Sequence, residues 1–188
     1  MTTALIIAGG VVVVLLLWLI VTHNKFVFKN NRVKQTESTI LVMLKQRNDM
    51  IPNLVATVQG YAGHENATLV RIAELRSLLQ QAGDEHEQMQ IGTELSKALA
   101  DVKVTVERYP NLKADAQFRR LQESIEAIEN QIQAARRTFN AAAVDFNNYV
   151  EMLPSSFIAS LEKRVTVDLI TIPESERENV NVRELFNQ

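Results

Sequence analysis

The pair His64–Glu65 is the part of the sequence closest to a catalytic metal motif. A zinc-binding HExxH helix needs a second histidine one turn later, but Thr68 occupies that position. The run 85–87 (Glu-His-Glu) also carries metal-binding atoms, yet three consecutive helical residues point in different directions. We interpret this run as a solvated helix start, where acidic side chains interact favourably with the helix dipole.

Composition argues against several other kinds of chemistry. The sequence has no cysteine, so it offers no thiolate nucleophile, disulfide or zinc-thiolate site, and it contains no glycine-rich phosphate loop or nucleophile elbow. Its net charge of −2 at pH 7 is unlike that of nucleic-acid-binding proteins, which concentrate basic charge on one face. We therefore expect no enzymatic activity, with no catalytic residue, metal, cofactor or nucleic-acid partner.

Two charged residues, Glu37 and Arg47, interrupt an apolar helical stripe. An unpaired charge there would be costly if it were buried. One interpretation is that the stripe reaches solvent near Glu37 and that Arg47 extends its charged end to the surface. The other is that buried ion pairs, such as Arg47 with Glu129 or Asp145, fix the register of the helices. Both remain open at this point.

Three asparagines, Asn53, Asn140 and Asn147, also lie on expected helices. A proline inside a helix frees a backbone carbonyl, and Pro52 should do so in the first long helix. We expect the asparagines to hydrogen-bond that carbonyl, with bonds to one another across helices as the alternative.

Basic and aromatic residues gather in the segment 22–34. They are Lys25, Phe26, Phe28, Lys29, Arg32 and Lys34. Each basic residue near an anionic membrane surface contributes about 1 kcal/mol of binding, and aromatic rings suit the headgroup level. We predict a membrane-surface site in contact with the lipid bilayer. The alternative for the two phenylalanines is packing on a neighbouring helix.

The segment before this site, residues 4–21, is apolar throughout. As a helix it is about 27 Å long, enough to cross the hydrocarbon core of a membrane. A cleaved signal peptide would require a basic start and a small-residue exit, which we do not find. Because the lysines and arginines follow the segment, the positive-inside rule places the N-terminus outside and the body in the cytoplasm.

The remaining sequence predicts an all-α fold. Apolar residues alternate in steps of three and four over 118–153, which indicates a helix of about 40 residues and 60 Å. Shorter stripes lie at 33–61, 69–82 and 95–109. We expect breaks at Gly60–Gly63, Gly83–Asp84, Tyr109–Pro110 and Pro154, and a kink at Pro52. The predicted architecture is a single N-terminal transmembrane helix followed by an antiparallel four-helix bundle with long helices over residues 32–161.

Residues 162–188 are expected to form an extended C-terminal tail. The stretch 165–172 is rich in β-branched residues and lacks helical periodicity. Because an isolated strand is unstable without a partner, it should lie either on another chain or on its own bundle.

Several motifs resemble the LemA family. They are the runs 47–55 (RNDMIPNLV), 58–65 (VQGYAGHE), 107–113 (ERYPNLK) and 134–140 (AARRTFN). The resemblance covers residues 1 to about 160 and ends at Leu161. The family-motif residues, to which we assign structural roles, are Arg47, Ile51, Pro52, Asn53, Leu54, Tyr61, His64, Glu65, Tyr109, Pro110, Arg136 and Asn140.

The resemblance implies a four-helix bundle behind one transmembrane helix. No enzymatic activity is established for the family in general, and some relatives are implicated in organising bacterial membranes, including those of magnetosomes. We therefore expect a non-enzymatic, homo-oligomeric scaffold for membrane organisation or envelope homeostasis. The alternative is a signalling or adaptor module that binds an unidentified membrane protein. The expected location is the bacterial inner (cytoplasmic) membrane, single-pass, with a periplasmic bundle as the alternative orientation.

Overall fold

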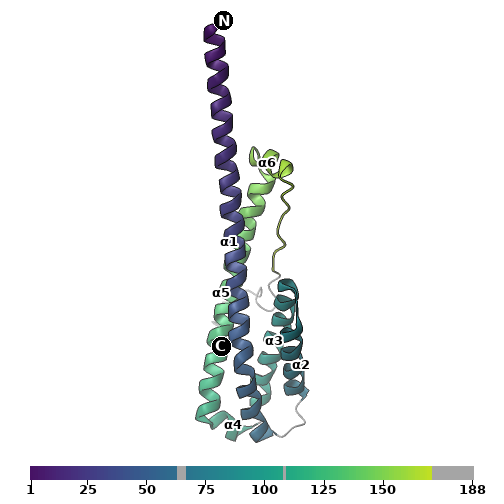
Figure 1. Ribbon diagram of the computed structural model, residues 1–188. Helices are drawn as coiled ribbons and strands as arrows, with labels where there is room; N and C mark the ends of the chain where they lie inside the picture. Colours follow the sequence, from purple (N-terminus) through teal and green to yellow (C-terminus); the bar gives the residue numbers. More distant parts are fainter. Residues whose placement is uncertain (63–66, 108, 171–188) are drawn as a thin grey trace, which may run out of the picture. The chain divides into compact units, whose positions relative to one another are not determined.

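The computed structural model describes residues 1–62, 67–107 and 109–170, and the regular elements in these ranges are helices (Figure 1). In chain order the elements are α1 (Thr2–Ala62), α2 (Ala67–Gln81), α3 (Glu85–Val106), α4 (Pro110–Ala114), α5 (Ala116–Glu151) and α6 (Ser155–Leu161). The all-helical class expected from the sequence is confirmed for these residues.

The chain folds into two compact units. The first combines residues 1–29 with residues from 139 onward, and the second comprises Asn30–Thr138. Because α1 and α5 cross the boundary, each contributes one part to the first unit and another part to the second.

The second unit is built around one apolar core. Residues from α1 to α5 contribute, at the three-and-four spacing that the sequence predicts. Its most deeply buried members are Ile51, Val58, Ile72, Leu95, Leu112 and Phe118, each 1% exposed or less. Burial of these stripes stabilises helices whose isolated segments would be marginal in water.

Helix ends follow the predicted breaks. The α2–α3 connection contains Gly83, and α4 begins at Pro110, whose missing N–H is not needed at a first helical position. Asp115 Oδ1 accepts a 2.7 Å hydrogen bond from the Phe118 N–H, so this side chain caps the start of α5. Helix α1 contains Pro52 in its interior and continues to Ala62 without restarting.

In the first unit, residues 164–170 are non-helical and lie against α5. Asn147 Nδ2 donates to the Val167 carbonyl, and Asn147 Oδ1 accepts from the Val167 N–H, both at 2.8 Å. Asn140 makes the same pair of bonds with Ile170, both at 2.9 Å. These contacts decide the position of this part of the tail, which lies on its own chain. Residues 171–188 lie outside the described ranges.

The expected role of the asparagines is therefore wrong for two of them. Asn140 and Asn147 bind neither the carbonyl freed by Pro52 nor each other, because their amides bind the backbone of residues 167 and 170. An extended backbone leaves N–H and C=O groups unpaired, and an asparagine side chain can satisfy one of each.

Candidate functional site

The apolar run of α1 is almost entirely exposed. Within the described residues, α1 is the one helix long and apolar enough to cross a membrane, with a mean hydropathy of 2.9 over its most apolar window. Side chains of this run, such as Val14 and Leu17, are more than half exposed. Such a continuous apolar surface marks an interaction site, and its length and composition are consistent with membrane anchoring.

Directly after this run, Phe26 fixes α1 to α5. Its side chain is 0% exposed, and its ring lies 6.4 Å from the Phe146 ring in an edge-to-face arrangement and 4.6 Å from the Tyr149 ring. The Arg164 guanidinium lies 5.4 Å from the Phe26 ring centroid. The placement of Phe26 at the membrane surface is therefore wrong, because this side chain points toward α5, whereas Phe28 is 68% exposed.

Two polar contacts surround this aromatic cluster. Lys29 Nζ lies 2.6 Å from Asp145 Oδ2 and 5.4 Å from the centroid of the Tyr149 ring. His23 Nδ1 lies 2.7 Å from Glu162 Oε1, just after α6. The His23 hydrogen bond, followed by the bond from Arg164, lowers the pKa of Glu162 below its usual value. The end of the apolar run is thus joined by side chains to both α5 and the α6 terminus.

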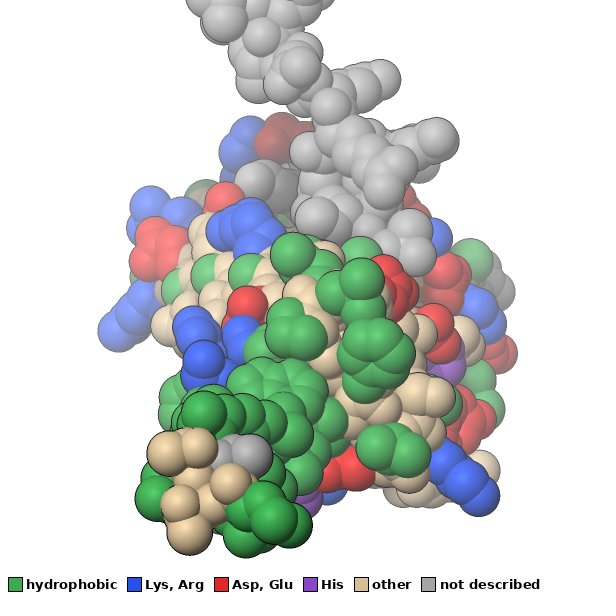
Figure 2. Space-filling view, turned by 90° about the horizontal axis from the view of Figure 1, so that it is seen from above, with side chains coloured by type: hydrophobic (Ala, Val, Ile, Leu, Met, Phe, Trp, Pro, Cys, Tyr) green, Lys and Arg blue, Asp and Glu red, His purple; other side chains and the backbone are tan. Residues whose placement is uncertain are grey.

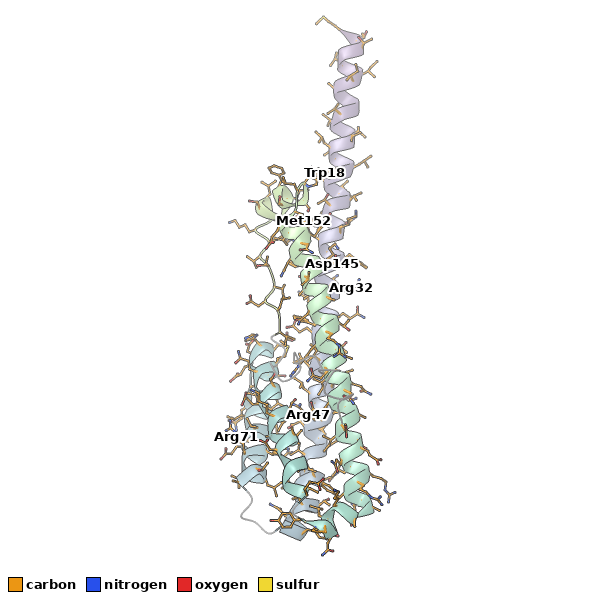
Figure 3. The ribbon with its side chains drawn as sticks, turned by 180° about the vertical axis from the view of Figure 1, so that it is seen from behind. Trp18, Arg32, Arg47, Arg71, Asp145 and Met152 are labelled. Atoms are coloured by element: carbon orange, nitrogen blue, oxygen red, sulfur yellow. The ribbon has the colours of Figure 1, made fainter. Side chains whose placement is uncertain are left out.

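A groove of about 460 Å³ opens between these elements. Trp18, Lys25 and Lys29 of α1 line one side, and Tyr149 and Leu153 line the other. Figure 3 shows Trp18 and Met152, which both line this groove, at a similar level partway along α1. The groove thus combines aromatic, apolar and cationic side chains, which is the combination that suits a membrane–water interface.

The remaining basic residues of the predicted membrane-surface site, Arg32 and Lys34, belong to the second unit. Both are exposed, as is Lys25 in the first unit.

The second unit contains a buried polar cluster centred on Arg47, which is 0% exposed. Its Nη1 donates to Glu129 Oε1 at 2.7 Å and to Ser96 Oγ at 2.6 Å, and its Nη2 donates to the Gly92 carbonyl at 2.9 Å. Ser96 Oγ also donates to Glu129 Oε2 at 2.9 Å. Of the two predicted partners of Arg47, Glu129 is therefore correct and Asp145 is wrong, because Asp145 pairs with Lys29.

Sequence reasoning missed the α3 side of this cluster. A Cβ atom on Gly92 would lie 2.8 Å from Leu44 Cδ2, so glycine permits the close approach of α1 and α3. Arg136, which is 1% exposed, donates from Nη2 to Thr93 Oγ1 at 2.9 Å. The available signal was the three small residues Gly92, Thr93 and Ser96, which lie within about one helical turn of one another around Leu95, the first residue of the α3 stripe.

Glu37, the second charge in the α1 stripe, has a different environment. It is partly buried, and the pKa of its carboxyl is raised by burial, with further contributions from Glu85 and Asp84. The acidic neighbours outweigh the cationic one, because the effect of Lys34, which lowers this pKa, is smaller than that of Glu85 or Asp84.

The other family-motif residues that the structure describes are divided between the core, the exposed surface and the helix ends. Ile51 and Leu54 are buried in the core, whereas Pro52 and Asn53 are exposed. Tyr61 donates a 3.1 Å hydrogen bond to Asp115 Oδ2, and Tyr109 and Pro110 lie at the start of α4. His64 and Glu65 lie outside the described residues.

Comparison with known proteins confirms the resemblance found in the sequence. The LemA family matches residues 36–183. The chain is 25% identical to Protein LemA of Metamycoplasma hominis over 165 residues, which cover 87% of this chain and 75% of that protein. It is 22% identical to the Magnetosome proteins MamQ 1 and MamQ 2 of Paramagnetospirillum magneticum, with 75% of this chain and 61% of each of those proteins covered.

The match also corrects one predicted boundary. It continues past Leu161, so that the segment held by Asn140 and Asn147 lies within the family region. The matched region comprises most of the sequence, and the chain belongs to the LemA family.

Proposed function

We propose that the protein is a membrane-anchored, non-enzymatic scaffold that homo-oligomerises and contributes to membrane organisation or envelope homeostasis. The observation that carries the proposal is the packing of α1 directly after the apolar run. Phe26, five residues after the apolar run, is buried against α5, and the Lys29–Asp145 and His23–Glu162 contacts hold the same junction. The anchor is therefore part of a folded unit, which suits a protein that holds a helical body in a defined position at the membrane.

The buried polar groups support a structural role. Arg47 connects α1 to α3 and α5 through Gly92, Ser96 and Glu129. A catalytic site requires polar groups that converge on a substrate, whereas these groups are engaged with one another. We further propose that α1, α2, α3 and α5 form the antiparallel four-helix bundle that the family resemblance implies, supported by the shared core of the second unit.

The exposed Lys25 and Phe28 support a bilayer-surface site of anionic lipid headgroups, and the exposed Arg32 and Lys34, one to two helical turns farther along α1, add longer-range attraction to that surface. In this proposal the chain crosses the bacterial inner membrane once, with its N-terminus outside and the bundle in the cytoplasm. The magnetosome proteins among its relatives favour a role in membrane organisation.

Mass measurement of the full chain in mild detergents tests the scaffold proposal. We expect a homo-oligomer, and crosslinking in native membranes should capture the same species. A monomer under both conditions would contradict the proposal. Combined with capture of one dominant membrane-protein partner, that result would favour the alternative, a signalling or adaptor module.

A further inference from the structure

A second apolar surface lies at the turn between α5 and the tail. Four side chains form this surface, which we call the apolar foot: Met152 (62% exposed), Leu153 (72%), Phe157 (66%) and Leu161 (80%). Phe157 and Leu161 are one turn apart and share the outward face of α6, whereas Ile158 and Ala159 are buried on its inward face. Helix α6 thus has apolar residues on both faces, although a helix on a water-exposed surface would have a polar outward face.

The apolar foot lies beside the end of the apolar run of α1. Met152 and Leu153 line the same groove as Trp18 and Thr22, and Glu162 contacts His23 directly after α6. Viewed from above, hydrophobic side chains gather around the N-terminal end of α1 and beside it (Figure 2). Both apolar surfaces therefore belong to one folded unit, and the foot lies beside the C-terminal end of the apolar run.

The depth of the foot can be estimated from α1. On α1 the groove runs from Trp18 to Lys29, about 16 Å along the helix axis. The foot is placed more closely by Glu162, next to Leu161, which contacts His23 two residues after the apolar run. The polar interfacial layer on each side of a bilayer is about 5–7 Å thick, and amphipathic surface helices bury their apolar faces about 5–10 Å deep. If the apolar run spans the hydrocarbon core, the foot lies at the level of the headgroups and the first acyl carbons.

We propose that the apolar foot inserts into the interfacial layer of the leaflet that receives the C-terminal end of the apolar run. This inference depends on the membrane anchoring in the proposed function. The charges near the foot select an anionic phospholipid surface as the partner, because the exposed Lys25 and Lys163 flank it, whereas Asp145 in the adjoining groove is paired with Lys29. A single transmembrane helix can rotate about its axis, whereas a second contact at the same leaflet fixes its rotation and tilt.

The absence of cysteine allows a direct test with one introduced label site per variant. The full chain with Phe157→Cys or Leu161→Cys is labelled with an environment-sensitive fluorophore and reconstituted in mixed phosphatidylcholine and phosphatidylglycerol vesicles. Quenching is then measured with nitroxide-bearing lipids and with aqueous iodide. We expect severalfold stronger lipid quenching and weaker iodide quenching than for the matched control, Leu169→Cys.

Leu169 is a suitable control because it is apolar and 50% exposed, yet it precedes Ile170, which binds Asn140. Asn140 lies twelve residues before Met152 on α5, about 18 Å along the helix. A label at Leu169 should therefore remain in water. Phe157→Ser combined with Leu161→Ser should keep the helix content and should change the tilt of α1 measured in oriented bilayers.

Trp18, the single tryptophan of the sequence, allows the membrane anchoring of α1 to be tested separately from the insertion of the foot. In one outcome, brominated lipids quench Trp18, whereas labels at positions 157 and 161 are quenched no more by lipid than the label at position 169. That result would contradict the insertion of the foot and would still support the membrane anchoring of α1. In another outcome, the labels at positions 157 and 161 are shielded from iodide but are not quenched by lipid. That result would indicate contact with a second copy of the chain and would also contradict the insertion of the foot. Absence of lipid quenching for Trp18 itself would contradict the membrane anchoring.

Discussion

Arg47 shows how one buried cation organises the second unit. Removing one partner of a buried ion pair leaves an unpaired charge and costs about 3–5 kcal/mol of unfolding free energy. We expect Arg47→Met to lower the unfolding free energy of the detergent-solubilised protein by about this amount, as measured by denaturation. The double variant Arg47→Met with Glu129→Leu should regain part of the loss, because it removes both charges.

Arg71 provides the matched control for that substitution, and Figure 3 labels both arginines. Its side chain is 54% exposed, and its contact with Glu74 is 3.6 Å long. Exposed pairs of this kind contribute about 0–1 kcal/mol, so Arg71→Met should have little effect. Equal losses for the two variants would show that Arg47 does not have the special role assigned here.

Substitution by alanine should change the stability of the protein in opposite directions at two glycines. At Gly60, inside α1, a Cβ atom would meet nothing within 4 Å, so Gly60→Ala should increase stability by up to about 1 kcal/mol. At Gly92, the same atom would lie 2.8 Å from Leu44 Cδ2, and such overpacking typically costs about 1–3 kcal/mol. Comparison of the two melting temperatures tests the close approach of α1 and α3, which a stabilising Gly92→Ala would contradict.

Glu37 should give the second unit a specific pH response. Because burial raises the pKa of this carboxyl in the folded state, the protonated form favours folding. That contribution is fully present below the unfolded pKa, about 4.3, and is lost as the pH rises through the higher folded value.

We therefore expect Glu37→Gln to raise the melting temperature at pH 7 by a small amount and to have no effect near pH 3. Glu123→Gln, at an exposed position on α5, serves as the control and should not change the melting temperature at pH 7. A Glu37→Gln variant less stable than the native chain at pH 7 would show that the ionised carboxyl makes a favourable contact.

At the scale of the elements, local sequence predicted the helices better than the contacts between them. Apolar periodicity located α2, α3 and α5, and Gly83, Pro110 and Pro154 lie at or near the helix ends because glycine and proline act on the local backbone. The Asn147–Val167 bonds could not be predicted in this way, since a side-chain amide carries no information about which distant backbone it will bind.

The choice between the alternatives for Phe26 also needed the structure. An aromatic residue beside basic residues is compatible with both headgroups and a helix interface, and only the position of α5 distinguishes them. The same reasoning holds for Arg47. Its position in an apolar stripe indicated burial or a solvent-exposed end, and the choice between Glu129 and Asp145 required the fold.

The tail segment 164–170 should depend on Asn147 for its position on α5. Asn147→Ala removes two hydrogen bonds, each contributing about 0.5–1.5 kcal/mol. We expect faster hydrogen exchange at the Val167 amide, with the α5 amides largely unaffected. Asn148→Ala is the matched control, because its side chain is exposed and the neighbouring asparagine keeps its bonds. Unchanged exchange in the Asn147 variant would mean that other contacts hold this segment.

At the scale of the whole molecule, the distribution of charge determines how the chain should lie across a membrane. The sequence carries Lys25, Lys29, Arg32 and Lys34 after the apolar run and no lysine or arginine before it. The positive-inside rule therefore predicts that the body stays in the cytoplasm. Protease added outside spheroplasts should leave the body intact, whereas permeabilised cells should show cleavage.

Lys29 allows a sharper version of this test, because its charge already pairs with Asp145, whereas Lys25, Arg32 and Lys34 are exposed. Replacing these three residues with glutamine should produce a mixed orientation, visible as partial digestion from outside, since the charge asymmetry that sets the topology is then largely removed. Replacing Lys45, Lys97 and Lys113 removes the same total charge far from the apolar run and should leave the orientation unchanged. Complete digestion of the native body from outside would instead establish the periplasmic orientation, and the foot would then contact the outer leaflet of that membrane.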